Sequence, residues 1–221
     1  HLVPLQKLRA FQELGHTVVL IFGDFTAMIG DPTGRSELRK PLTREQTRAN
    51  AKDYLKEASR VIDVKKNTEI HYNSEWLDAR GVPGLLELAS KMSVQRAIER
   101  EDFRKRMAED HEVSILETLY PLLQGYDSVA IRADLEIGGT DQKFNLLMGR
   151  RIQRKYDQSE QDVMMLPLVE GTDGVRKMSK SYGNYIAIKD EPANMYGKVM
   201  SIPDQLILKY FVTFTRKPLT E

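Results

Sequence analysis

The chain contains no cysteine among its 221 residues. Disulfide bonds and thiolate metal sites are therefore excluded, and a reducing compartment suits the chain. Long apolar runs are also missing: the longest near the beginning, Val18 to Phe22, is far below the ~20 residues of a membrane-spanning helix. Lys7 and Arg9 interrupt the first apolar stretch, which is not the form of a signal peptide. We expect a cytoplasmic protein with no membrane contact and no metal site of its own.

The chain has almost no net charge, because 33 basic residues oppose 32 acidic ones and leave a formal charge of +1. A surface that binds polyanions everywhere is excluded, so any nucleic-acid surface must be local. Two basic stretches are candidates, Arg35 to Arg48 and Arg150 to Lys155. A solvated helix face explains each of them equally well.

Hydrophobic periodicity and capping signals predict helices that alternate with short strands. Helices are expected over residues 4–14, 43–61, 114–124, 141–156 and 203–214, and strands over residues 17–22, 69–72, 134–137 and 163–168. This alternation is typical of an α/β fold with a doubly wound parallel sheet. Such sheets bind ligands beyond the carboxyl ends of their strands. We therefore expect the chemistry in the loops after residues 22, 137 and 168.

A charged helical stretch, residues 81–112, interrupts this alternation. Its apolar stripe consists of Leu85, Leu86, Leu88, Met92, Val94 and Ile98. We interpret the stretch as an insertion between strands. The stripe can pack on the sheet or face a second molecule.

A basic loop follows the last predicted strand and reads Lys177-Met178-Ser179-Lys180-Ser181. Two lysines three residues apart, among small hydroxyl side chains, can fold over a polyphosphate, because each is a compact charge on a flexible stem. The charge pattern alone favours an ordinary solvated loop.

A polar stripe runs through the predicted helix at 114–124 and its continuation. Tyr120, Gln124 and Asp127 are spaced i, i+4, i+7 and therefore share one helix face, beside apolar Leu122 and Leu123. The stripe can bind a ligand, or it can form a buried network that satisfies itself.

Glycine-rich loops follow two of the predicted strands. Gly138 and Gly139 let a nucleotide approach the backbone, and Asp141 can accept both hydroxyls of a ribose or simply cap a helix. The segment from Gly30 to Gly34 is not a phosphate-binding P-loop. It has three intervening residues where that loop has four, and Arg35 stands at the lysine position.

Residues 177–181 are identical to the KMSKS signature of class I aminoacyl-tRNA synthetases. The polar stripe and both glycine-rich loops resemble those of the tyrosyl-tRNA synthetases in this class. The resemblance implies ATP-dependent activation of tyrosine to tyrosyl-adenylate and transfer to tRNA(Tyr), with Mg²⁺ accompanying ATP. It further implies a homodimer whose interface the insertion supplies.

The resemblance also implies roles for individual residues. The catalytic residues would be Lys177, Lys180 and His1. Tyrosine would be bound by Asp31, Tyr120, Gln124, Asp127 and Gln142. ATP would be bound by His1, Gly139, Asp141, Leu168, Val169, Lys177, Met178, Ser179, Lys180 and Ser181. Arg35 would contact the pyrophosphate or the tRNA end.

The resemblance divides the chain into four parts. Residues 1–80 and 113–200 would form the two parts of the nucleotide-binding fold, 81–112 the insertion, and 201–221 the start of a helical region. His1 matches the last residue of the HIGH motif, so we expect the rest of that motif, and a C-terminal tRNA-reading domain, to lie outside this chain. A tryptophanyl-tRNA synthetase and a non-catalytic RNA-binding homologue are the alternatives.

Overall fold

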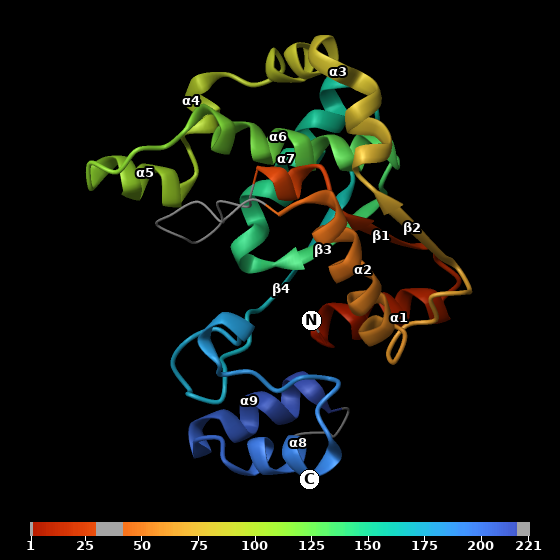
Figure 1. The fold of residues 1–221 in the computed structure, drawn as a ribbon, viewed down its shortest axis with the longest axis vertical. Coiled ribbons are helices and arrows are strands. Elements are labelled where there is room, and N and C mark those ends of the chain that lie inside the picture. Colours follow the sequence, from red (N-terminus) through yellow and green to blue (C-terminus); the bar gives the residue numbers. More distant parts are fainter. Residues whose placement is uncertain (1, 30–41, 216–221) are drawn as a thin grey trace.

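The computed structural model describes residues 2–29 and 42–215. The first half contains α1 (Leu2–Glu13), β1 (Val18–Phe22), α2 (Arg44–Ala58), β2 (Thr68–Tyr72) and α3 (Ser74–Ala89). It is followed by α4 (Val94–Ala97), α5 (Glu101–Ala108), α6 (Ile115–Ala130), β3 (Leu135–Gly139), α7 (Lys143–Lys155) and β4 (Asp162–Leu166). The last helices are α8 (Pro192–Met200) and α9 (Asp204–Phe214), and short 3₁₀ turns lie at Thr26–Met28, Thr140–Gln142 and Lys180–Tyr182 (Figure 1). His1, Asp31 and Arg35 lie outside the described residues.

The strands form parallel pairs. In one pair, β1 lies beside β2 with Val18 opposite Thr68 and Phe22 opposite Tyr72. In the other, β3 lies beside β4 with Leu135 opposite Asp162. Among the described residues, no strand hydrogen bonds join one pair to the other. The mixed α/β fold with parallel strands confirms the fold class read from the alternation of helices and strands.

Helix boundaries follow the capping signals in most places. Thr43 and Gln46 form a complete capping box at α2, as expected, and Ser114 forms one with Glu117 at α6. The predicted end of α6 near Gln124 is wrong, because the helix continues through Gly125 to Ala130. A Cβ atom at Gly125 would lie 3.1 Å from Ile152, so this glycine serves the close packing of α6 on α7 and does not end the helix.

Three other local expectations differ from the structure. Helix α3 begins at Ser74, before the helical stretch expected from residue 81, and is kinked at Gly81, which has φ 57°. Helix α7 begins at Lys143, after a 3₁₀ turn that contains Asp141. Helix α8 was not expected, since its nine residues carry only a short apolar pattern.

Two apolar clusters hold these elements together. One joins α6 to α7 and contains Leu122, Leu123, Val129, Met148 and Ile152. The other joins α1 and α2 to β1 and contains Leu5, Val18, Leu20, Ala58 and Ile62. Removing such side chains from water stabilises the fold by about 1.5–3 kcal/mol for each fully buried one. The packed helices therefore fix where each strand ends.

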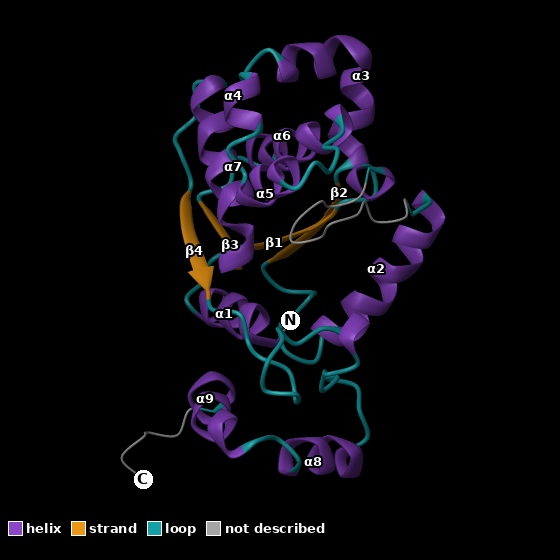
Figure 2. Ribbon diagram, turned by 90° about the vertical axis from the view of Figure 1, so that its left-hand side faces the viewer, coloured by secondary structure: helices purple, strands orange, loops and turns teal. Residues whose placement is uncertain are grey.

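Helices α8 and α9 lie at one end of the molecule, far from α3 and α4 at the other (Figures 1 and 2). Contacts with the α2 region tie this end to the rest: Arg60 donates to the Ile188 carbonyl at 2.9 Å, and Lys189 pairs with Glu57 at 3.3 Å. Of the helices in residues 2–29 and 42–215, none is long and apolar enough to cross a membrane.

Candidate active site

The loops after β1 and β2 are fastened to α6 by one asparagine. Asn73 accepts a hydrogen bond from the Phe25 amide at 3.0 Å and donates to Thr26 Oγ1 at 3.1 Å. Its Nδ2 also donates to Asp127 Oδ2 at 3.4 Å. Asn73 is fully buried, so this junction is rigid and ties two strand ends to the polar stripe.

Asp127 is the carboxyl group of the stripe, and its surroundings shift its pKa. It is 9% exposed and accepts hydrogen bonds from Trp76 Nε1 at 2.8 Å and from Asn73. Burial raises the pKa of Asp127 to about 7, although both hydrogen bonds act in the opposite direction. A carboxylate held by two neutral donors can still accept a hydrogen bond from a hydroxyl group, which is the role predicted for it.

Gln124 and Tyr120 share a face of α6 with Asp127, because the helix is continuous from Ile115 to Ala130 despite Pro121. Gln124 Nε2 donates to Glu136 Oε1 on β3 at 3.4 Å. Tyr120 is partly buried and packs against the α6–α7 cluster. Gln124 of the stripe therefore contacts the amino-terminal half of β3, the strand that leads into the glycine-rich loop.

The glycine-rich loop meets the KMSKS segment directly. Lys177 Nζ lies 3.0 Å from Asp141 Oδ2, and both side chains are partly exposed. Gly139 has no room for a side chain, because a Cβ atom there would lie 2.5 Å from Asp141 Oδ1 and 3.1 Å from Leu168. Four of the residues predicted to bind ATP, from three segments of the chain, are thus brought together.

The KMSKS segment folds back on the end of β4. The Met178 amide donates to the Val169 carbonyl at 2.7 Å, and Glu170 and Lys177 form an antiparallel bridge. Ser179 and Ser181 share a hydrogen bond of 2.8 Å between their hydroxyl groups. Lys180 is exposed and forms no ion pair with a carboxylate of the described residues.

Gln142 is placed differently from the rest of the predicted tyrosine set. Its Oε1 accepts a hydrogen bond from Asn145 Nδ2 at 2.9 Å, so its amide is held at the start of α7. The other described members of this set are Tyr120, Gln124 and Asp127, and all of them lie on α6.

Four residues of this site were not predicted from sequence: Asn73, Trp76, Glu136 and Asn184. Asn184 is 5% exposed, accepts from the Ser179 amide at 2.9 Å and donates to Asp173 Oδ2 at 2.9 Å. The sequence signal that could have identified Asn184 is its position directly after Gly183, a glycine with φ 68°. Trp76 is the only tryptophan of the chain and lies in the first turn of α3, just after a strand, which also marks it in sequence.

Several arginines of the two basic stretches are neutralised. Arg150 and Arg154 both pair with Glu160, at 3.3 and 2.5 Å, and Arg44 pairs with Asp78 at 2.6 Å. These contacts favour the interpretation of solvated helix faces.

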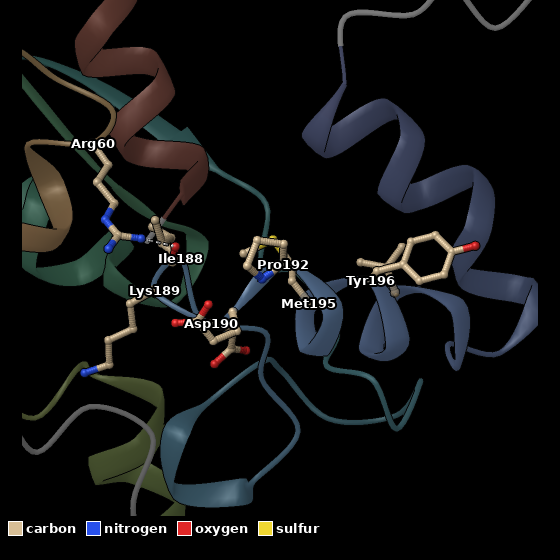
Figure 3. A pocket seen from close by; sticks show the side chains of 9 residues that line it. Arg60, Ile188, Lys189, Asp190, Pro192, Met195 and Tyr196 are labelled. Carbon is tan, nitrogen blue, oxygen red and sulfur yellow. Dashed lines mark hydrogen bonds between the residues drawn. The ribbon is translucent and has the colours of Figure 1, made fainter.

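A cavity of about 620 Å³ lies elsewhere, between α8 and the region of Arg60. Figure 3 shows Arg60 reaching the Ile188 carbonyl on one side, and Met195 and Tyr196 of α8 on the other. None of the predicted site residues lines it. The candidate site is therefore the region where the loops after β3 and β4 contact the KMSKS segment.

Parallel strands that end in a glycine-rich loop, next to a basic loop and a polar helix face, define a nucleotide-using α/β protein. The whole chain, residues 1–221, matches the model of the family described as tRNA synthetases class I (W and Y). The chain belongs to this family.

Two of the most similar curated relatives carry the name tyrosine–tRNA ligase. The protein of Thermotoga maritima is 58% identical over 218 residues, which cover 99% of this chain and 54% of the relative. That of Burkholderia lata is 55% identical over 221 residues, which cover 100% of this chain and 53% of the relative. The chain therefore spans about half the length of these relatives.

Solved structures agree with the family. A tyrosyl-tRNA synthetase from Archaeoglobus fulgidus, complexed with L-tyrosine, superposes with a TM-score of 0.70 at 26% identity, covering 92% of this chain and 60% of that one. A tryptophanyl-tRNA synthetase from Campylobacter jejuni gives a TM-score of 0.65 at 18% identity, covering 91% of this chain and 62% of that one. The second likeness shows the fold alone.

Proposed function

We propose that this chain is the catalytic part of a tyrosine–tRNA ligase, which activates tyrosine with ATP and transfers it to tRNA(Tyr). The observation that carries the proposal is the contact between Lys177 of the KMSKS segment and Asp141 of the glycine-rich loop, 3.0 Å apart. It joins the two predicted ATP-binding segments at the strand ends, beside the polar face of α6. The names of the relatives at 55–58% identity support the same reaction.

In the proposed reaction, the tyrosine carboxylate attacks the α-phosphate of ATP and releases pyrophosphate. No side chain acts as a nucleophile. Lys177 and Lys180, with His1, stabilise negative charge on the phosphates, since flexible ammonium groups can follow the oxygen atoms on which charge develops. Asp141, once Lys177 turns to the phosphates, is free to accept the ribose hydroxyls. Gly139 leaves the backbone open to the adenosine, with Leu168 and Val169 beside it.

The tyrosine side chain is proposed to reach Asp127. A buried carboxylate that receives a phenolic hydroxyl penalises phenylalanine, because the carboxylate then loses a hydrogen bond that water cannot replace. Tyr120, Gln124 and Asp31 would bind the ammonium group, and Gln142 the carboxyl group after its amide leaves Asn145. Tryptophan is the competing substrate, because an acid can also accept an indole N–H.

Mg²⁺ is proposed to enter with ATP. In residues 2–29 and 42–215, no group of three or more His, Cys, Asp or Glu side chains is placed to hold a metal ion. The phosphates and water would therefore supply most of its ligands, which is the usual arrangement for Mg²⁺ with nucleotides. When bound, the ion neutralises phosphate charge.

The remaining expectations concern assembly. A homodimer is supported by exposed apolar side chains on and beside the proposed insertion: Val82 is 69% exposed, Leu86 65%, Val94 76% and Ile115 81%. Patches of this kind mark protein–protein contacts. Arg35 remains proposed as a contact to pyrophosphate or the tRNA end, and a cytoplasmic location follows from the same reaction. The division of the chain into four segments, with boundaries after residues 80, 112 and 200, also remains a proposal.

Tyrosine-dependent exchange of labelled pyrophosphate into ATP tests the proposal. We expect exchange with tyrosine from the full-length natural protein, and exchange weaker by about 100-fold or more with tryptophan or phenylalanine, which lack the hydroxyl group that the site binds. Exchange that depends on tryptophan would assign the chain to the other branch of its family. Absence of exchange with every amino acid, together with retained tRNA binding, would leave the non-catalytic RNA-binding homologue.

A further inference from the structure

Glu136 is a carboxylate at the centre of a network of neutral groups. It lies on β3 and accepts hydrogen bonds from Gln161 Nε2 at 2.5 Å, Ser128 Oγ at 3.3 Å and Gln124 Nε2 at 3.4 Å. Burial raises its pKa, and these three donors oppose that effect without cancelling it. When this carboxyl group is ionised, its partners are amide and hydroxyl groups, and no cation among the described residues offsets its charge in a region of reduced dielectric constant.

A glycine on α7, Gly149, leaves the space that this network occupies. A Cβ atom at Gly149 would lie 2.5 Å from Gln161 Nε2, 2.7 Å from Ser128 Oγ and 3.1 Å from Glu136 Oε2. Residue 149 must therefore be glycine if these three groups are to meet. The network is a built feature of the interface between α6, α7 and β3.

Two carboxylates near the polar stripe have no cationic partner among the described residues. Asp127 is held by Trp76 and Asn73, and Glu136 by Gln161, Ser128 and Gln124. Their charges repel, since Glu136 helps to raise the pKa of Asp127. Elsewhere in the described core the opposite holds: Glu117 is 1% exposed and pairs with Arg106 at 2.5 Å. A site where two neighbouring carboxyl groups lack a cation is suited to a cationic ligand, which would favour their ionised forms.

The contact between Glu136 and Gln124 fixes the orientation of the Gln124 amide group. A glutamine amide has an oxygen that accepts and an NH₂ group that donates. Because Glu136 can only accept, it fixes the NH₂ group of Gln124 toward β3. The oxygen of Gln124 is then turned away from Glu136, where it can accept a hydrogen bond from an ammonium group.

We infer that Glu136 is a positioning residue for substrate binding: it orients Gln124 and supplies the unpaired negative charge that attracts the ammonium group of the amino acid. The inference rests on the proposed function and deepens it, because it assigns the recognition of the ammonium group to a residue that does not itself need to touch the substrate. A purely structural role would affect the whole fold and every ligand alike.

The test compares two competitors of tyrosine that differ only in the ammonium group. Tyrosinol carries it, and 3-(4-hydroxyphenyl)propan-1-ol lacks it. Both inhibition constants are measured by pyrophosphate exchange on the full-length natural protein and on its Glu136→Gln variant. We expect the variant to bind tyrosinol about tenfold or more weakly, which is the usual loss for a hydrogen bond to a charged group. Binding of the deaminated competitor and of ATP should change less than about twofold.

A matched control and a rescue variant complete the design. Glu160→Gln removes a carboxylate that pairs with Arg154 near the other end of α7, and it should leave both competitors unchanged. Glu136→Asp keeps the charge and should recover most of the tyrosinol affinity. If Glu136→Gln does not fold, Glu136→Ala replaces it, with a loss for tyrosinol that exceeds the loss for the deaminated competitor.

The outcomes separate the inference from the proposed function. Equal losses for both competitors, or no loss for either, would overturn the role of Glu136 while wild-type exchange with tyrosine still supports the reaction. Absence of exchange by the wild-type protein would instead remove the proposed function itself.

Discussion

Two buried aspartates show how the surroundings of one residue type decide its role. Asp24 is fully buried and accepts from the amide and the hydroxyl of Ser74, at 3.0 and 2.8 Å, with Arg48 3.5 Å away. Its charge is compensated, and it anchors the start of α3. Asp127 is also buried but has only neutral donors. An uncompensated carboxylate costs stability, which a ligand that donates a hydrogen bond can offset.

Replacing Asp127 should weaken the binding of tyrosine but not that of ATP. We expect Asp127→Ala to abolish detectable tyrosine binding, because the phenolic hydroxyl loses its acceptor, and to leave ATP affinity within about twofold. Equilibrium titration with each ligand measures both effects. Unchanged affinity for tyrosine would remove Asp127 from the specificity argument.

The pKa of Asp127 also predicts how stability depends on pH. The folded-state value of about 7 lies above the ordinary value of 3.8, so the folded chain holds this proton more tightly than the unfolded chain. The contribution of Asp127 is therefore fully present below about pH 4 and is lost as pH rises toward 7, by up to about 1.4 kcal/mol per pH unit.

Urea unfolding of the wild-type protein and of Asp127→Asn, from pH 4 to pH 8, measures this contribution. The free energy of unfolding of the wild type should fall relative to that of the variant over this range. A difference that does not change with pH would show that Asp127 ionises normally.

At the scale of elements, the KMSKS segment is held from one side by a single residue. Besides its bonds to Ser179 and Asp173, Asn184 donates to the carbonyl groups of Arg176 and Lys177 at 3.4 and 3.2 Å. A Cβ atom at Gly171 would lie 2.2 Å from the Asn184 amide, so the turn after β4 is also shaped around it. Lys177 reaches Asp141 from a backbone that Asn184 fixes.

Removing this residue should loosen the segment without unfolding the protein. We expect Asn184→Ala to speed tryptic cleavage after Arg176, Lys177 and Lys180 by about tenfold, because each lost hydrogen bond contributes roughly 1 kcal/mol locally. Pyrophosphate exchange should fall at least as much, with tyrosine affinity unchanged.

Asn50→Ala, an exposed position on α2, is the control for this experiment. Cleavage rates equal to those of the control would show that Asn184 does not restrain the segment.

At the scale of the whole molecule, exposed apolar side chains gather at both ends. Val82, Leu86, Val94 and Ile115 belong to α3, α4 and α6, at the end opposite α8 and α9 (Figure 1). Helix α9 exposes apolar side chains as well, with Leu208 at 63%. The end formed by α3 and α4 coincides with the proposed insertion, and so it is the end where the proposed dimer would form.

Charge placed at that end should separate the subunits. We expect the full-length natural protein to sediment as a dimer, and the variant with Leu86→Glu and Val94→Glu to sediment as a monomer with an unchanged circular dichroism spectrum. Two buried glutamates would cost far more than a dimer contact gains. Leu208→Glu on α9 is the matched control and should remain dimeric. A wild-type monomer would contradict the proposal.

Much of the fold followed from local signals in the sequence. The β-branched run at Val18 to Phe22 predicted β1, and the capping box at Thr43 predicted the start of α2, because both depend on residues close together in the chain. The i, i+4, i+7 spacing likewise placed Tyr120, Gln124 and Asp127 on one helix face.

The sequence by itself thus determined most of the elements, their parallel arrangement and the KMSKS segment. Only the tertiary structure decided which side chains meet. The contact of Lys177 with Asp141 spans 36 positions and that of Asn73 with Asp127 spans 54. Whether Gly125 ends a helix or packs against another depends on α7, and whether Glu136 faces water or a network depends on Gln161, both elsewhere in the chain. Local propensity carries no information about such partners, because they are set by the packing of α6, α7 and β3 around a shared core.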